Sequence, residues 1–347
     1  MMAGGLPAEE LFPRRPLAEA FLTAVARSRC EALQYGWPEG DEALRRWIAR
    51  RLAARGVGVT TEHVLVTSGA QQALAIAVAL IGLEGKTVGV DAVTYPGALD
   101  LFRSCGARFA TDDPSREKRS DLFYVMPGAS NPRGEGLSEA RSARLLETGK
   151  PLVVDEAYAE LRFDGQPPRP LIERARDRVF HIGTLSKTLS PGLRVGWLIA
   201  PPHLAERALT IKRDMDLQAS SLGQSVAAAY LESGDYDSLV LRARVLYASR
   251  CQRLQRALER ADLGLTFHEP EGGFSIFVET NLEGIDEARA LSLATAHKVS
   301  FDPGSMFRPD GAASPFAMRL SCSSLETSQI DDAVDRLKQV LLALAVS

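Results

Sequence analysis

The chain has 347 residues, of which 45% are hydrophobic and 24% charged, with a formal net charge of -3. That length predicts a large domain and a smaller one in a globular protein. The composition lacks the positive excess that binding to nucleic acid or to an anionic membrane requires, so we expect neither partner and favour a small substrate that is weakly charged or anionic.

Two helices are predicted near the start of the chain. Residues 41–55 have helical spacing, with one apolar face and arginines opposite, which indicates a helix that packs one side on the protein body. The apolar face carries Leu44, Trp47, Ile48 and Leu52. Residues 71–81 are apolar almost all round, which predicts a helix buried against a sheet.

Short apolar or β-branched runs recur between the helical patterns. They cover residues 64–67, 87–91, 122–126, 152–155, 179–182 and 195–200. Strands that alternate with helices predict an α/β fold in which helices sandwich a mostly parallel sheet.

The pattern changes from about residue 239. A long arginine-rich helix runs to residue 261, an alternating strand covers residues 274–278, and an amphipathic helix begins at Gln329. We assign residues 31–238 to the large domain, and residues 1–30 with 239–347 to an N-terminal arm and a smaller α+β domain. No flexible linker separates them, so a shared cleft is expected.

The cysteines and the N-terminus bear on the cellular compartment. Cys30, Cys105, Cys251 and Cys322 lie far apart without paired spacing, so they predict neither a metal site nor a disulfide framework. The N-terminus lacks a basic segment followed by an apolar run, and no stretch approaches the roughly 20 apolar residues that span a bilayer. We expect a cytoplasmic protein.

A lysine follows the predicted strand 179–182. Lys187 lies just past a strand end, where α/β folds bind ligands, and its amine can form an imine with an aldehyde cofactor when it is partly deprotonated. Thr184, Ser186 and Arg194 add hydroxyl groups and a guanidinium, which bind phosphate. By themselves these residues fit a surface loop with an incidental lysine equally well.

An aspartate ends the predicted strand 152–155. The carboxylate of Asp155 can pair with a protonated pyridine nitrogen and keep such a ring cationic, and Tyr158 can donate to its phenolate oxygen. The alternative is a capping aspartate at an ordinary turn.

Other turns after predicted strands carry weaker signals. Residues 68–71 lie between a strand and a helix, where free backbone N–H groups form an anion site. Tyr95 can stack on a flat ring, and Asn131 can hydrogen-bond to its oxygen. Each alone is more often a turn or a core aromatic residue.

Arg319 lies between apolar neighbours in the second domain. A half-buried arginine needs an acidic partner, and a substrate carboxylate would supply a bidentate one. An internal salt bridge is the alternative.

Taken together, the order and spacing of these residues resemble the class I/II aminotransferases of pyridoxal phosphate (PLP) fold type I along nearly the whole chain. Within that family the chain is similar to the α-aminoadipate and kynurenine aminotransferases, to which the aminotransferase-like domains of MocR regulators are also similar. The further motifs that carry this likeness are Gly4-Gly5-Leu6-Pro7, Leu11-Phe12-Pro13, Tyr35-Gly36 with Gly40, Gly272-Gly273-Phe274 and Pro303-Gly304.

The resemblance implies PLP as the cofactor and a role for each candidate residue. Lys187 would be the Schiff-base lysine and proton shuttle, Asp155 the partner of the pyridine nitrogen, and Tyr158 and Asn131 the ligands of the phenolate oxygen. Tyr95 would stack on the ring. The phosphate would be held by Gly69, Ala70, Gln71, Thr184, Ser186 and Arg194.

The resemblance also implies the substrate contacts and the assembly. Arg319, with Asn131 beside it, would take the substrate α-carboxylate. Tyr35 resembles the tyrosine that a partner subunit adds to the cofactor site, which implies a homodimer with sites at its interface.

The chain departs from the family pattern in two places. Arg133-Gly134 follows Asn131-Pro132 where the family has a small Thr-Gly pair, and the segment from Gly106 to Leu122 has little room for the helix that usually precedes that strand. Neither departure touches the cofactor contacts, so both bear on the substrate.

The expected activity is transfer of an amino group between an L-amino acid and a 2-keto acid. The same residues support elimination, racemisation or decarboxylation, because the cofactor supplies the chemistry. The likeness to MocR leaves open a PLP-binding sensor domain, for which a basic winged-helix segment is expected ahead of the arm. The chain offers many arginines for a distal acidic group, so no single substrate is predicted. These are Arg14, Arg15, Arg162 and Arg308.

Overall fold

The computed structural model describes all residues except 1, 27–30, 112–118 and 346–347. Its larger sheet has seven strands in the order β1-β7-β6-β5-β4-β2-β3. In chain order they are β1 (Leu65–Thr67), β2 (Thr87–Val90), β3 (Arg108–Thr111), β4 (Leu122–Val125), β5 (Leu152–Asp155), β6 (Val179–Thr184) and β7 (Gly196–Ile199). Strands β2 to β6 pair in parallel. Strand β7 is antiparallel to both of its neighbours, β1 and β6. The predicted α/β fold with a mostly parallel sheet is confirmed.

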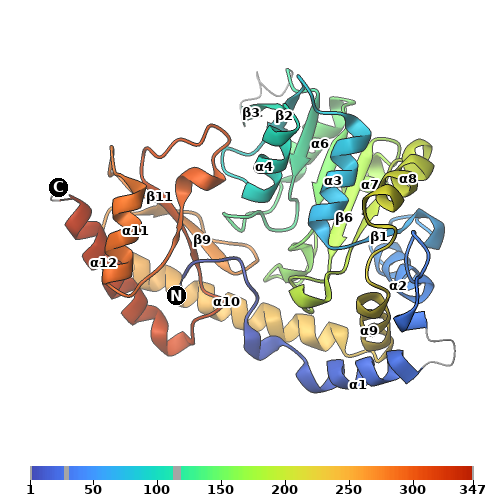
Figure 1. Cartoon of the computed structure of the whole chain (residues 1–347). Coiled ribbons are helices and arrows are strands. Elements are labelled where there is room, and N and C mark those ends of the chain that lie inside the picture. Colours follow the sequence, from blue (N-terminus) through green and yellow to red (C-terminus); the bar gives the residue numbers. More distant parts are fainter. Residues whose placement is uncertain (1, 27–30, 112–118, 346–347) are drawn as a thin grey trace.

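Helices cover both faces of this sheet (Figure 1). They are α2 (Glu42–Ala53), α3 (Ala70–Ile81), α4 (Pro96–Ser104), α6 (Glu139–Glu147), α7 (Leu171–Arg174), α8 (Ala205–Asp216) and α9 (Ser221–Glu232). Neighbouring strand residues point to opposite faces, so Val153 belongs to the core cluster that includes α3 and α4, and Val154 to the one that includes α2 and α9.

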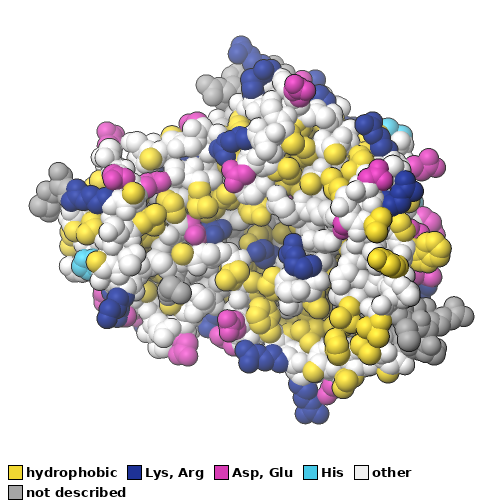
Figure 2. Space-filling view, in the orientation of Figure 1, with side chains coloured by type: hydrophobic (Ala, Val, Ile, Leu, Met, Phe, Trp, Pro, Cys, Tyr) yellow, Lys and Arg dark blue, Asp and Glu magenta, His cyan; other side chains and the backbone are white. Residues whose placement is uncertain are grey.

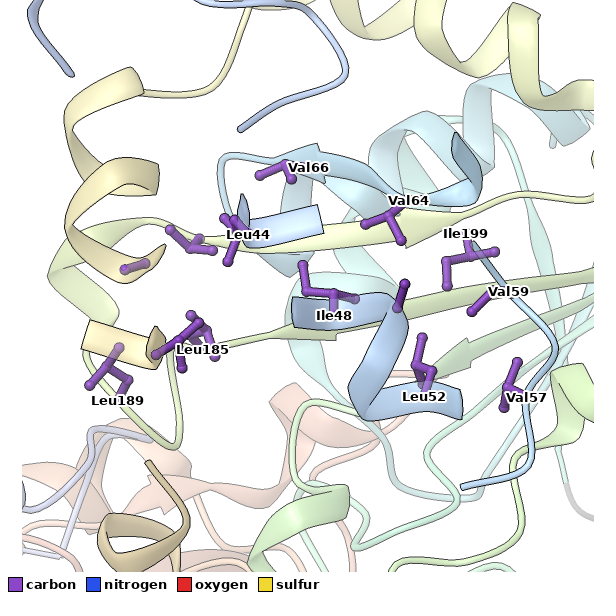
Figure 3. Packing of buried hydrophobic residues seen from close by; sticks show 14 of the residues in the cluster. Leu44, Ile48, Leu52, Val57, Val59, Val64, Val66, Leu185, Leu189 and Ile199 are labelled. Atoms are coloured by element: carbon purple, nitrogen blue, oxygen red, sulfur yellow. The ribbon is translucent and has the colours of Figure 1, made fainter. Parts of the chain in front are cut away.

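The two predicted helices lie as expected. Helix α3 is buried against the sheet, and α2 turns its apolar face inward (Figure 3). On α2, Leu44, Ile48 and Leu52 are buried beside Ile199 of β7, whereas Trp47 is only partly buried. The Asp41 carboxylate caps the helix by accepting from the backbone N–H of Leu44, at 2.9 Å.

The second part of the chain forms an antiparallel sheet in the order β10-β11-β9-β8. Its strands are β8 (Thr266–Phe267), β9 (Ser275–Glu279), β10 (Asp302–Pro303) and β11 (Ala317–Ser321), and its helices are α10 (Tyr236–Ala261), α11 (Glu287–Ala296) and α12 (Ile330–Ala345). The predicted long helix, strand and final helix are therefore present. None of the helices in the described part of the chain is both long and apolar enough to cross a membrane.

The N-terminal arm joins the two parts of the molecule. Met2 is buried against the smaller sheet, where its backbone bonds to Ser300 and Ser321 (Figure 1). The chain then leads to α1 (Arg14–Ala26), which packs on α9 of the larger part. The short 3-10 helices are Glu9–Leu11, Glu31–Leu33, Thr61–His63, Ala159–Leu161, Pro191–Leu193, Pro202–Leu204, Gly304–Phe307 and Thr327–Gln329.

The structure contains elements and contacts that the sequence did not predict, among them strands β8, β10 and β11 of the smaller sheet. Strand β3 was not predicted, because as an edge strand it is only partly buried and lacks an apolar run. It occupies the start of the short segment before Leu122, and residues 112–118 lie outside the described residues. Cys251 and Cys322 are distant in the sequence, but their sulfur atoms lie 3.3 Å apart in the core, both as free thiols. Cys30 lies outside the described residues.

His181 is buried in the middle of β6. Among the described residues its Nδ1 atom has no hydrogen-bond partner. Burial lowers the pKa of His181 from 6.5 to about 4, although the nearby Glu156 carboxylate acts in the opposite direction. The folded protein therefore holds this imidazole neutral, whereas the unfolded chain can protonate it near pH 6.5.

This pKa difference predicts a loss of stability in mild acid. Between pH 6.5 and 4 the unfolded state binds more protons, so the free energy of unfolding falls as the pH falls. Lowering the pH from 7 to 5 should reduce the free energy of unfolding by about 2 kcal/mol through His181. Denaturant titrations at both pH values should show a smaller decrease in His181→Gln than in the wild type. The exposed His203 is the control, and equal pH dependence in His181→Gln and His203→Gln would contradict the prediction.

Candidate active site

Most of the predicted site residues meet at one edge of the larger sheet. Strands β1, β2, β4, β5 and β6 all end at this edge, and parallel strands place the segments that follow them side by side there. Together these segments line a pocket of about 150 Å³. Its lining is Ala70, Gln71, Leu74, Tyr95, Met126, Asn131, Asp155, Ala157, Tyr158, Thr184, Ser186, Lys187 and Arg194.

One end of the pocket is built to hold an anion. Gly69 precedes α3, so the helix begins at Ala70 and turns its N-terminal N–H groups toward the pocket. Arg194 donates from Nη2 to the Ser68 carbonyl oxygen at 2.9 Å. The Thr184 hydroxyl oxygen accepts from the Ser186 backbone N–H at 3.1 Å and lies 3.0 Å from the Ser186 hydroxyl oxygen. N–H groups, hydroxyls and a guanidinium therefore converge, which suits a phosphate.

Two glycines make this arrangement possible. Gly69 has φ +94°, and a Cβ atom there would lie 2.7 Å from Arg194 Nη2. A Cβ on Gly196 would lie 2.5 Å from the Gly69 carbonyl carbon. The backbone at the end of β1 thus approaches both the start of β7 and the Arg194 side chain more closely than any other residue type allows.

The Asp155 carboxylate lies at the other side of the pocket. It is buried, accepts from the Tyr124 hydroxyl at 2.9 Å and accepts from the Ala157 backbone N–H at 3.0 Å. Burial raises the pKa of Asp155, while these hydrogen bonds and the charge of Lys187 act to lower it. A cation placed beside this carboxylate would offset its loss of hydration.

Tyr124 was missed as a site residue. It lies in β4, where its fully buried side chain reads in the sequence as a core aromatic. The signal that pointed to a role was its hydroxyl, because a buried Tyr hydroxyl usually needs a hydrogen-bond partner. That partner is Asp155 on the neighbouring strand.

Lys187 reaches the pocket from the loop after β6. Its Nζ atom donates to the Gly5 carbonyl oxygen at 2.7 Å and lies 5.6 Å from the centroid of the Tyr158 ring. The Phe274 ring, at 6.0 Å, completes an aromatic surrounding for the amine. The contact with Gly5 was not predicted, since it joins the N-terminal arm to a residue 182 positions later.

Tyr95 lies at the start of α4, with its side chain in the pocket. Its hydroxyl donates to Gln71 Oε1 at 3.3 Å, and burial raises the pKa of Tyr95. Gln71 in turn donates from Nε2 to the Gly97 carbonyl oxygen at 2.9 Å. These bonds connect the start of α3 with the start of α4 along one wall of the pocket.

Arg319 lies on β11 and points toward Asn131 at the pocket. Its Nη1 donates to Asn131 Oδ1 at 2.8 Å, and its Nη2 donates to Asp302 Oδ2 at 2.7 Å. The internal salt bridge that the sequence left as an alternative is therefore present. The peptide bond between Asn131 and Pro132 is cis.

The remaining candidates lie outside this pocket. Tyr35 is 79% exposed and lines a separate hollow with Trp37. Arg133, which replaces the expected small residue, lies 3.6 Å from the Glu279 carboxylate. The four distal arginine candidates also lie elsewhere: Arg14 and Arg15 pair on the surface with Glu9 and Glu19, Arg162 pairs with Asp164 and Glu271, and Arg308 bonds to the Ala312 and Pro315 carbonyls.

Comparison with known proteins shows the family of the chain. The family model described as "Aminotransferase class I and II" matches residues 13–337. The chain belongs to this family. The protein is therefore an aminotransferase, and its cofactor is pyridoxal phosphate.

Individual relatives cover nearly the whole aminotransferase. It is 31% identical to aromatic-amino-acid aminotransferase 1 of Thermococcus litoralis, over 98% of this chain and 87% of the relative. The crystal structure of LysN, an α-aminoadipate aminotransferase of Thermus thermophilus complexed with N-(5'-phosphopyridoxyl)-L-leucine, superposes with a TM-score of 0.89 at 32% identity, covering 99% of this chain and 92% of LysN. The probable regulator MocR of Rhizobium meliloti is 27% identical over 99% of this chain and 72% of the regulator.

The close packing at Gly69 predicts a selective effect on cofactor binding. In Gly69→Ala the new Cβ must displace the Arg194 guanidinium, so the dissociation constant of PLP should rise by roughly tenfold or more. The backbone strain should also lower the free energy of unfolding by about 1–3 kcal/mol. Both quantities can be measured, by titration of the cofactor-free protein and by denaturant unfolding.

Gly82→Ala is the matched control. Gly82 also has a positive φ, +67°, but a Cβ there meets no heavy atom within 4 Å. The Gly82→Ala variant should therefore be less stable than the wild type but should bind PLP with the same affinity. Equal PLP affinity in the two variants would contradict the role given to the Gly69 turn.

Proposed function

We propose that this aminotransferase moves the amino group of an L-amino acid to a 2-keto acid, with Lys187 as its catalytic lysine. The observation that carries the proposal is that one pocket joins the Lys187 amine, the buried Asp155 carboxylate and the anion-binding turn at Gly69. A phosphate, a cationic ring and a reactive aldehyde, the three parts of PLP, each have a matching group there.

The residues of the pocket fit the cofactor part by part. The start of α3 with Thr184, Ser186 and Arg194 would hold the phosphate, and Asp155 would hold the ring nitrogen in its protonated form. Tyr95 would lie against the ring. Tyr158 and Asn131 would donate to its phenolate oxygen.

Bound PLP supplies an aldehyde that takes the amino group and a ring that withdraws electrons from the substrate Cα. Lys187 then acts as the base, because its Nζ atom is the amine that the pocket brings to the reacting centre. Nζ takes the proton from Cα and carries it during the exchange. Arg319 and Asn131 would bind the α-carboxylate and so orient the Cα–H bond.

The sequence by itself left two alternatives open, and both would use the same residues. Elimination, racemisation and decarboxylation need the same cofactor site, and they differ in which bond at Cα is oriented for cleavage. A sensor role would keep cofactor binding without turnover. The names of the relatives include aromatic and aminoadipate aminotransferases, so aromatic and dicarboxylic amino acids are the first substrates to test.

We also propose that the aminotransferase is a homodimer. Exposed apolar side chains gather over α1 and α9 in Figure 2, and Tyr35 and Trp37 are 79% and 76% exposed. Leu22 on α1 and Leu33, at the end of a short helix that packs on α9, are exposed as well. Exposed apolar side chains that gather in one place often mark a protein–protein interface. A second copy would cover it and could bring its own Tyr35 to the cofactor site.

Two further expectations stay predictions. The division into a large domain at residues 31–238 and a small one at residues 239–347 with an arm at 1–30 is consistent with the two separate sheets. Limited proteolysis would test it. The cytoplasmic location rests on the sequence, and cell fractionation would test it.

Replacing the lysine tests the proposed function directly. The wild type loaded with PLP should show the near-visible absorption band of a lysine-bound cofactor, and a suitable amino acid should convert it to the shorter-wavelength band of pyridoxamine phosphate. Lys187→Ala should lack the first band and should lose activity by at least a thousandfold, since the general base is gone. Lys150→Ala, at an exposed position, is the control. A band that no amino acid converts would point to another reaction or to a sensor.

The dimer is tested by the double variant Leu33→Glu with Trp37→Glu. Two charges on the apolar surface should prevent association, so the mass in solution should fall from twice 37.6 kDa to the monomer value. Because Tyr35 would come from the partner, the affinity for PLP should fall as well. Leu342→Glu on α12 is the control, being exposed and apolar but distant from α1 (Figure 1). A monomeric wild type would overturn the proposal.

A further inference from the structure

The Arg319 guanidinium is enclosed on several sides. Besides its bonds to Asn131 and Asp302, its Cζ atom lies 4.8 Å from the centroid of the Phe307 ring. Gly5 of the N-terminal arm covers it closely, since a Cβ there would lie 3.4 Å from Nη1. The side chain is 9% exposed, so these contacts fix the orientation of the charged group.

Asp302 faces Arg319 directly across the smaller sheet. The two residues are register partners in the antiparallel pair of β10 and β11. Arg319 donates from Nε at 3.1 Å and from Nη2 at 2.7 Å, both to the Oδ2 atom of Asp302. Directly opposed residues of opposite charge attract, and here the pair is largely removed from water, which strengthens the attraction.

The same carboxylate also holds the N-terminal arm. The Gly4 backbone N–H lies 2.9 Å from Oδ2 and 3.2 Å from Oδ1 of Asp302. Oδ2 thus accepts from both Arg319 and Gly4, whereas Oδ1 has only the longer contact to Gly4 among these bonds. An amide oxygen in the place of Oδ2 would keep the shorter bonds without the negative charge.

We infer that Asp302 sets the affinity of the active site for carboxylates, by partly neutralising Arg319. This inference rests on the proposed function, in which Arg319 binds the substrate α-carboxylate. A substrate carboxylate bound to Arg319 lies within about 6 Å of the Asp302 carboxylate, since both contact one guanidinium. At an effective dielectric constant of about 40, between that of a protein surface and that of water, repulsion at this distance weakens binding by roughly tenfold.

Such an effect belongs to binding and not to chemistry. The α-carboxylate is unchanged while the amino group moves, so its repulsion from Asp302 is the same in the ground state and in the transition state. Where the chemical step and not product release limits turnover, Asp302 therefore raises KM for every donor and acceptor and leaves kcat unaltered. All four reactants of a transamination carry this carboxylate, so the residue promotes release of both keto acid and amino acid products.

The test compares an acid with its amide. Hydrocinnamate and hydrocinnamide have the same shape but only the acid is charged, and neither carries an amino group that reacts. Their dissociation constants are measured by calorimetry on the PLP-loaded wild type and on Asp302→Asn. The variant should bind the acid roughly tenfold more tightly and the amide within twofold of the wild type, and kcat should be unchanged while KM falls.

Asp332→Asn is the matched control. Asp332 also pairs with an arginine, Arg336 at 2.8 Å, but on the surface of α12. The Asp332→Asn variant should bind hydrocinnamate and hydrocinnamide with the same dissociation constants as the wild type. Should Asp302→Asn not fold, Asp302→Ala and Asp302→Ser are measured, because any neutral residue there should shift the ratio of the acid to the amide constant in the same direction.

Two outcomes overturn the inference. An unchanged ratio in the neutral variants shows that the Asp302 charge does not oppose the ligand, and a ratio that shifts toward weaker acid binding shows that Asp302 only orients Arg319. Failure of the proposed function is recognised separately: Arg319→Met would then keep the wild-type ratio, which would place the carboxylate site elsewhere, or the wild type would lack the absorption band of the lysine-bound cofactor.

Discussion

The active site depends on the common direction of the strands in the larger sheet. Strands β4, β5 and β6 run in parallel, so their C-terminal ends lie at the same edge of the sheet. Met126, Asp155 and Thr184 lie at or directly after these ends and are therefore close together. The antiparallel β7 then begins at this edge, which returns Arg194 to the pocket. Hydrogen bonding within the sheet fixes these positions, so the loops at the edge need only orient side chains that are already close.

This dependence explains which parts of the site the sequence could predict. Asp155 ends one apolar strand and Lys187 follows another, and both runs are visible in the sequence, so their place at a strand end could be predicted from the pattern. Strand β3 could not, because an edge strand with partly exposed residues has no such run. Tyr124 was hidden for a different reason, since a tyrosine inside a buried strand has the same pattern whether its hydroxyl is structural or functional.

Contacts between distant segments were beyond the sequence pattern. The pairing of Asp302 with Arg319 depends on the register of β10 and β11, and Lys187 meets Gly5 only because the arm crosses between the two parts of the molecule. Cys251 and Cys322 show the same limit, since their separation in the sequence concealed two sulfur atoms in contact. In each case a local pattern specifies the element, whereas the packing of elements specifies the partner.

Asp155 and Asp302, two carboxylates near the pocket, differ in whether a cation already pairs with them. The hydrogen-bond donors to Asp155 in the described part of the chain, the Tyr124 hydroxyl and the Ala157 N–H, are neutral, so its burial is incompletely offset and its pKa is raised. A cationic ring would relieve that cost, and its binding would lower the pKa of Asp155 again. Asp302 already has a cation, Arg319, and gains nothing from a second anion. The site thus attracts the cofactor strongly on the side of Asp155 and the substrate weakly on the side of Asp302, which suits an enzyme that keeps one and exchanges the other.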